Sequence, residues 1–238
     1  MASTRERAQA LIVAGRVLVD GQKVEKAGTG VAAEAELRLL GEELKYVSRG
    51  GLKLERALEH WGIAARGRVC MDVGASTGGF TDCLLQQGAA RVIAIDTGYG
   101  QMAARLRTDP RVRLLERTNA RYLKPEEVGE AASLVCVDVS FISATLVLPA
   151  VMRAVASRRP PVASEKLELI VLVKPQFEAG RDKVGKGGIV RDPEVQQAAV
   201  ERVRRTVEEL GGGDSEVIES PILGAEGNRE FLLHAHFE

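Results

Sequence analysis

The hydrophobic pattern of the chain changes near residue 45, and the longer stretch behind that point alternates two kinds of segment. Short runs of consecutive apolar residues are typical of strands buried on both faces, and amphipathic stretches at helical spacing separate them. The runs predict strands at 69–73, 91–96, 112–115, 134–138 and 167–173, with two more near Val217 and Phe231. The other stretches predict helices at 52–61, 78–88 and 143–157, and one capped by Asp192 and Pro193. This alternation indicates an α/β fold with a mostly parallel sheet covered on both faces.

The first 44 residues predict a small separate unit. Ser3 and Glu6 form a capping-box pair before a short helix that Gly15 terminates. Two β-rich runs then flank an Asp20-Gly21 turn, which predicts a tight hairpin, and 36–40 adds a strand. A unit of about 45 residues buries little core by itself. We therefore divide the chain into a small domain at 1–44, a linker at 45–51 and a larger domain at 52–238.

Composition narrows the class of protein. The chain has 238 residues, of which 45% are hydrophobic and 4% aromatic, as in soluble globular proteins. Its 33 basic and 33 acidic residues balance, although residues 1–68 carry 12 Lys or Arg against 9 Asp or Glu, so the front is mildly basic. Three cysteines without a CxxC pair predict neither a disulfide framework nor a metal site. No apolar run approaches the roughly 18 residues of a membrane span and no signal-peptide pattern is present, so we expect a cytoplasmic protein.

Residues 69–80 carry the clearest functional pattern, a strand that enters a glycine-rich turn and then a helix. Such turns lie where ligands bind in α/β sheets, although any strand-to-helix turn favours glycine. The next strand ends in Asp96, whose carboxylate can accept hydrogen bonds from the hydroxyls of an adenosine ribose. A dinucleotide site needs glycine where this chain has Ser76, so S-adenosylmethionine (AdoMet), which has no pyrophosphate, fits better. We predict cofactor contacts from Asp72, Gly74, Ser76, Thr77, Gly78, Gly79, Phe80, Asp96, Asn119 and Asp138.

The same turn supports a second interpretation, an α/β-hydrolase. Residues 74–78 satisfy the nucleophile-elbow pattern G-x-S-x-G, and Asp138 and His234 follow Ser76 in the chain order that such a triad needs. We rank this hypothesis second, because the chain has no His-Gly-Gly oxyanion segment and His234 lies inside an apolar strand pattern. A histidine at the edge of the core is the simpler explanation.

Two other predicted strands are each followed by a charged residue. The run 134–137 is followed by Asp138 and the run 167–173 by Lys174, so both side chains should reach the edge that carries the glycine turn. They can form part of a site there or a purely structural ion pair. Farther along, Glu230 begins the final predicted strand.

Five segments give the chain a recognisable family resemblance. They are 46–54, 72–82, 173–178, 184–192 and 224–231, and with them the sequence resembles the TlyA family of RNA ribose methyltransferases, also labelled haemolysin A, within the FtsJ-like group. The resemblance implies a Rossmann-like, AdoMet-dependent methyltransferase domain with a catalytic tetrad at Lys53, Asp138, Lys174 and Glu230. It also implies a front domain similar to a small RNA-binding fold of a ribosomal protein. The family normally carries a further helix before the first one here, so we expect an incomplete front domain.

The implied reaction is in-line transfer of a methyl group to a ribose 2′-hydroxyl, with ribosomal RNA or an assembled subunit as partner. Lys174 is our candidate to accept or stabilise the hydroxyl proton, and Asp138 and Glu230 would orient the two amines. The haemolysin label suggests a membrane-acting alternative, which we rank low because no stretch combines a basic face with a strong apolar face. We predict RNA contacts from Arg5, Arg7, Arg16, Lys23, Arg49, Lys183, Lys186 and Arg191.

Overall fold

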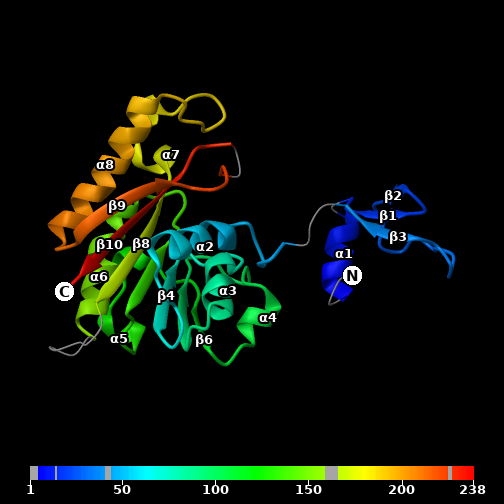
Figure 1. Cartoon of the computed structure of the whole chain (residues 1–238), viewed down its shortest axis with the longest axis horizontal. Coiled ribbons are helices and arrows are strands. Elements are labelled where there is room, and N and C mark those ends of the chain that lie inside the picture. Colours follow the sequence, from blue (N-terminus) through cyan, green and yellow to red (C-terminus); the bar gives the residue numbers. More distant parts are fainter. Residues whose placement is uncertain (1–4, 14, 41–43, 159–165, 225–226) are drawn as a thin grey trace. The chain divides into compact units, whose positions relative to one another are not determined.

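A computed structural model describes residues 5–13, 15–40, 44–158, 166–224 and 227–238 (Figure 1). The chain divides into two compact units, residues 1–44 and 45–238. Each is described by itself below. Ser3, which the sequence suggests as a helix cap, lies outside the described residues.

The front unit is one helix and a three-stranded antiparallel sheet. It contains α1 (Arg5–Val13), β1 (Val17–Val19), β2 (Gln22–Val24) and β3 (Leu37–Leu39), in the sheet order β2-β1-β3. Asp20 and Gly21 join β1 to β2 with φ angles of 50° and 80°. Positive φ at both central residues matches the right-handed twist of a two-residue hairpin, and an Asp-Gly pair tolerates it best. The predicted hairpin and the added strand are therefore confirmed.

The second unit is built on a seven-stranded sheet. Its strands are β4 (Val69–Val73), β5 (Arg91–Ile95), β6 (Val112–Leu115), β7 (Leu134–Val137), β8 (Leu167–Val173), β9 (Gly213–Glu219) and β10 (Phe231–Phe237). They lie in the order β6-β5-β4-β7-β8-β10-β9. Neighbours from β6 to β8 are parallel, whereas β10 is antiparallel to both β8 and β9. The mostly parallel sheet is as predicted.

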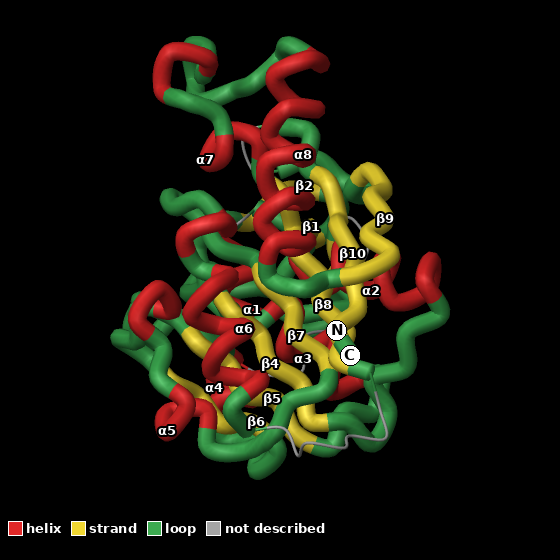
Figure 2. Tube along the Cα trace, turned by 90° about the vertical axis from the view of Figure 1, so that its left-hand side faces the viewer, coloured by secondary structure: helices red, strands yellow, loops and turns green. Residues whose placement is uncertain are grey.

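Helices cover both faces of this sheet (Figure 2). The longer ones are α2 (Gly50–Trp61), α3 (Gly79–Gln86), α6 (Leu148–Ala156) and α8 (Pro193–Glu209). Short turns of helix are α4 (Ala104–Arg107), α5 (Pro125–Val128), α7 (Pro175–Glu178), η1 (Ala120–Tyr122), η2 (Ala144–Leu146) and η3 (Arg181–Lys183). Side chains of α2 and α3 share one buried cluster with strand residues such as Cys70, while α6 and α8 share another with Met71. Successive residues of β4 thus face opposite layers, as the pleat requires.

Two sequence expectations need correction. The helix predicted at 143–157 is broken into η2 and α6, because Pro149 lies in the first turn of α6, lacks an N–H and disfavours helix at the residue before it. Residues 45–51 are not a linker but pack onto the second unit. Tyr46 is 1% exposed, and the backbone N–H of Val47 donates to Asp82 Oδ2 at 2.8 Å.

Candidate active site

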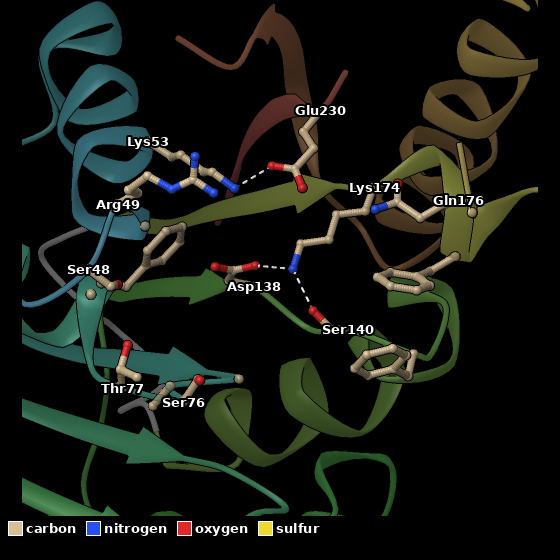
Figure 3. Close-up of a pocket in the computed structure, with 18 of the residues that line it drawn as sticks. Ser48, Arg49, Lys53, Ser76, Thr77, Asp138, Ser140, Lys174, Gln176 and Glu230 are labelled. Carbon is tan, nitrogen blue, oxygen red and sulfur yellow. Dashed lines mark hydrogen bonds and ion pairs between the residues drawn. The ribbon is translucent and has the colours of Figure 1, made fainter. Parts of the chain in front are cut away.

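A cavity of about 550 Å³ opens at the carboxyl edge of the parallel strands, and the four charged side chains of the tetrad expected from the family resemblance share its wall (Figure 3). Lys53 comes from the first turns of α2, Asp138 follows β7, Lys174 follows β8, and Glu230 precedes β10. Because β10 runs antiparallel to β8, with Phe231 beside Val173, its start lies at the end of β8. The topology therefore brings together four residues spread over 177 positions of the chain.

The four charges form two ion pairs. Lys174 Nζ lies 2.5 Å from Asp138 Oδ1 and also donates to Ser140 Oγ at 2.8 Å. Lys53 Nζ donates to Glu230 Oε2. Lys53 and Lys174 are each 9% exposed and Glu230 is 3% exposed. Because an unpaired charge is costly to bury, the carboxylate beside each amine stabilises its buried positive charge.

The glycine turn after β4 forms another part of the same wall. Gly74 has a φ of 91°, and a Cβ atom there would lie 2.4 Å from the backbone oxygen of Asp138. A side chain at this position would therefore separate β4 from the residue that holds Lys174. Ser76 also adopts a left-handed conformation, with a φ of 47°. The cavity wall further includes Thr77, Gly79 and Phe80, all predicted cofactor contacts.

Asp72 does not line this cavity but supports the turn from behind. It is fully buried in β4, and its Oδ2 accepts hydrogen bonds from the backbone N–H and the hydroxyl of Thr81, at 2.8 and 2.6 Å. Burial raises the pKa of Asp72 to about 7, with the bonds from Thr81 opposing the rise and the charge of Asp138 adding to it. Gly78, which has a φ of 95°, also lies outside the described wall. Both residues shape the turn.

A second cavity of about 380 Å³ adjoins the first at the ends of β5 and β6. Asp96 and Asn119 line it, as predicted for cofactor contacts. Asp96 accepts hydrogen bonds from the backbone N–H groups of Ser76 and Gly98, at 2.7 and 2.6 Å. Both cavities are lined by Gly74, Ser76, Asp138, Ser140 and Phe141, so one wall separates them.

Sequence reasoning missed several residues of these walls. Ser140, Phe141, Gln176 and Phe177 line the first cavity, and Gln101 lines the second. The Phe141 side chain is 93% exposed, and its ring centroid lies 5.3 Å from that of Phe177. Their position just beyond the ends of β7 and β8 was the available signal, because side chains there reach the ligand edge.

The hydrolase interpretation is wrong. His234 pairs with Ile170 in the sheet, and its Nε2 lies 2.5 Å from Oε2 of Glu168 at the start of β8. Ser76 lies past the carboxyl end of β4, at the same edge of the sheet as Lys174, whereas Glu168 lies near the opposite end of β8. His234 therefore cannot reach Ser76.

The predicted RNA contacts do not all lie together. Arg49 lines the first cavity, and Lys183, Lys186 and Arg191 are exposed on the segment that contributes Val184 and Gly188 to its wall. In the front unit Arg5 and Lys23 are exposed, while the half-buried Arg16 donates from Nε to the backbone oxygen of Leu40 at 2.9 Å. Nothing is described of the Arg7 side chain.

The described residues contain no cluster of three or more potential metal ligands from His, Cys, Asp and Glu. None of the helices described is both long and apolar enough to cross a membrane.

Comparison with known proteins agrees with this geometry. The FtsJ-like methyltransferase family matches residues 46–237, and the S4 domain matches residues 1–37. The 16S/23S rRNA (cytidine-2′-O)-methyltransferase TlyA of Mycobacterium tuberculosis is 47% identical over 98% of this chain and 84% of its own length. Hemolysin A of Brachyspira hyodysenteriae is 39% identical over 97% of this chain and 93% of its own length.

A solved structure of a candidate hemolysin from Streptococcus thermophilus superposes with a TM-score of 0.76 at 40% identity, covering 99% of this chain and 84% of the other. The relatives thus include a protein named as a methyltransferase and proteins named as hemolysins, and the family resemblance seen in the sequence carries the same two names. The family match spans the whole described site, from Lys53 to Glu230. The chain therefore belongs to the TlyA family of FtsJ-like methyltransferases.

Proposed function

We propose that this chain transfers a methyl group from AdoMet to a ribose 2′-hydroxyl of ribosomal RNA. The observation that carries the proposal is the cavity in which two buried amines, each paired with one carboxylate, adjoin the glycine turn. Relatives named as rRNA 2′-O-methyltransferases support the choice of substrate. Alignment of the acceptor oxygen with the methyl group can lower the barrier by about 7 to 11 kcal/mol in well-oriented systems.

The residues of the second cavity fit the nucleoside part of AdoMet. Asp96 and Asn119 would hold the ribose and base, and the turn from Gly74 to Thr77 would hold the remainder. Both oxygens of Asp96 already accept a backbone N–H, yet each carboxylate oxygen retains a lone pair for a ribose hydroxyl. When bound, AdoMet supplies a methyl group carried on a positively charged sulfur.

Lys174 would accept or stabilise the proton of the attacking hydroxyl. Its amine has one neighbour in Asp138 and another in Ser140, which leaves a third direction for a substrate oxygen. Lys53, paired with Glu230, would contribute a second positive charge to the same cavity. The two carboxylates would orient the amines.

The rim of the first cavity suits a nucleotide. The exposed ring of Phe141, beside Phe177, provides an aromatic face on which a base can stack. Arg49 provides a positive charge for a backbone phosphate. The front unit, matched by the S4 domain, would dock the surrounding RNA.

We place this activity in the cytoplasm, where ribosomal RNA is found. Cys70, Cys83 and Cys136 are buried and free of disulfides, as is usual in a reducing compartment.

The direct test is incubation of purified ribosomal subunits with the protein and labelled AdoMet, followed by mass-spectrometric mapping of methylated nucleosides. We expect label on a ribose 2′-oxygen, its loss with Lys174→Ala, and its retention with the control Arg205→Ala, whose side chain is 70% exposed on α8.

Two outcomes would contradict different parts of the proposal. Calorimetric binding of AdoMet without methylation of any ribosomal RNA would reject the substrate. Methylation of a base nitrogen or carbon would reject the acceptor atom and leave the cofactor assignment intact.

A further inference from the structure

We infer that Ser140 is a positioning residue for the Lys174 amine, held in place by a clamp that Glu178 forms between two loops of the site. The inference deepens the proposed function and rests on it for the identity of the reaction. Ser140 lies in the wall common to both cavities, two residues after Asp138.

The starting observation is that one amine has two oxygen neighbours, Ser140 in a hydrogen bond and Asp138 in an ion pair. Asp138 Oδ1 and Ser140 Oγ lie 2.5 and 2.8 Å from Lys174 Nζ, and both belong to the loop that leaves β7 (Figure 3). A tetrahedral amine has three further directions besides its carbon bond. With one hydrogen-bonded and one ion-paired neighbour fixed, the remaining side of the amine is the one available to the acceptor oxygen of the RNA.

Ser140 itself is exposed, and an exposed hydroxyl on a free loop would gain little by binding an ammonium group that water can also solvate. Its loop is not free. Three residues on, Ser143 Oγ donates to Glu178 Oε2 at 2.5 Å, and the backbone N–H of Ala144 donates to Glu178 Oε1 at 2.7 Å.

Glu178 belongs to the same short segment as Lys174. The backbone N–H of Phe177 donates to the Lys174 oxygen at 2.9 Å, which folds 174–178 into one turn. Glu178 is 3% exposed, and its backbone oxygen accepts from Arg202 of α8 at 2.7 Å. The loop after β7 and the loop after β8 are thus joined at two places, at Lys174, which contacts Asp138 and Ser140, and at Glu178.

These contacts form a closed ring that runs from Lys174 to Glu178, across to Ser143, back to Ser140 and again to Lys174. Such a ring holds Ser140 in position before substrate binds. A small displacement of a reacting group can lower a rate about 100-fold. The hydroxyl of Ser140 acts through Lys174.

The test compares Ser140→Ala with Ser140→Thr, which keeps the hydroxyl, and with the control Ser157→Ala. Ser157 donates a comparable hydroxyl bond, to the Arg153 oxygen at 2.8 Å, at the far end of α6. We expect Ser140→Ala to lower the single-turnover rate of methylation about 10- to 100-fold, with AdoMet affinity and the KM for RNA within about twofold of wild type. Ser140→Thr should restore the rate to within about threefold, and Ser157→Ala should not change it.

Because Ser140 acts through the amine, its effect should vanish where the amine is absent. In a Lys174→Arg background, adding Ser140→Ala should cost less than about threefold. Glu178→Ala should reproduce the slow rate of Ser140→Ala, and the two should not be additive. If the buried Glu178→Ala variant does not fold, Ser140→Ala and its double mutant with Lys174→Arg still decide the question.

A second readout does not depend on RNA methylation. Amine labelling with acetic anhydride at one fixed pH, resolved by peptide mass spectrometry, measures how fast Lys174 Nζ reacts in the free protein. Without the Ser140 hydroxyl the amine loses the hydrogen bond that holds it, so Lys174 should be labelled at a different rate in Ser140→Ala while Lys53 keeps its wild-type rate.

Wild-type protein that labels normally but methylates no RNA would contradict the proposed function alone. A full methylation rate and an unchanged rate of Lys174 labelling in Ser140→Ala would refute the role of Ser140. A large loss of AdoMet affinity would also refute it, because Ser140 would then hold the cofactor.

Discussion

Replacement of Lys174 separates two roles that its geometry permits. Lys174 is 9% exposed, and its amine has Asp138 Oδ1 at 2.5 Å and Ser140 Oγ at 2.8 Å. It can take the proton from the RNA hydroxyl, or it can remain charged and stabilise negative charge on the oxygen. Lys174→Arg keeps the positive charge but cannot release its proton within a protein, whereas Lys174→Ala removes both functions.

The expected magnitudes differ between the two roles. Loss of a general base costs about 100- to 10,000-fold in rate, which is about 3 to 5 kcal/mol of transition-state stabilisation. We expect the amine to take the proton, so that Lys174→Arg loses nearly as much rate as Lys174→Ala. The Ala variant also leaves Asp138 without its cation in a largely buried position, so it should lose stability as well.

The assay is the single-turnover methylation rate of ribosomal RNA across pH, with enzyme in excess and AdoMet saturating. Calorimetry on each variant checks that AdoMet binding is retained, and urea unfolding separates lost rate from lost fold. Retention of most activity in Lys174→Arg would refute proton transfer to this amine and favour charge stabilisation. Rates near wild type in Lys174→Ala would remove the residue from the mechanism.

Three further predictions concern other parts of the molecule. Asp96→Ala should weaken AdoMet binding, measured by calorimetry, at least about tenfold, because the carboxylate both orders the Ser76 turn and remains available to ribose hydroxyls. Unchanged affinity would contradict this placement of the nucleoside. Deletion of residues 1–43 should preserve AdoMet binding but sharply slow RNA methylation. The slope of log affinity for RNA against log salt concentration should also become less steep by about one unit for each lost phosphate contact. Unchanged kinetics and an unchanged slope would show that the front unit does not dock RNA. The folded protein holds the Asp72 proton up to about pH 7 and the unfolded chain releases it near the ordinary value of 3.8, so this group lowers the free energy of unfolding as pH rises between those values. Urea titrations of wild type and Asp72→Asn should show a difference that changes over that interval and is level above it, and a constant difference would contradict the raised pKa.

The sequence predicted the second unit well where burial leaves a plain signal. In each of β4 and β8 every residue but one is apolar, so the limits of these strands coincide with the predicted ones. The meeting of Asp138 with Lys174 followed from the rule that parallel strands end at one edge. Partnership between Lys53 and Glu230 came from family resemblance, because α2 and β10 are far apart in the chain.

Other features had no signal of that kind. Asp72 was expected to touch the cofactor, but a strand buried on both faces has no alternation of polar and apolar residues to show which way a side chain points. Ser140 and Phe141 lie in a loop without periodicity, and their importance depends on which neighbouring loop lies beside them. The boundary at 45–51 was misjudged because Tyr46 packs against Gly51, a contact that paired glycines do not predict.

The antiparallel position of β10 between β8 and β9 has a consequence for folding. Among the described strands, β9 pairs with β10 alone, and the contact of Lys53 with Glu230 joins residues 177 positions apart in the chain. Contacts between such distant residues form slowly, since the entropy of closing the loop is lost before the contact forms. Enzymatic competence should therefore appear in the last kinetic phase of refolding, after the helical signal in circular dichroism has recovered, and a chain stalled before Phe231 would be compact but inactive.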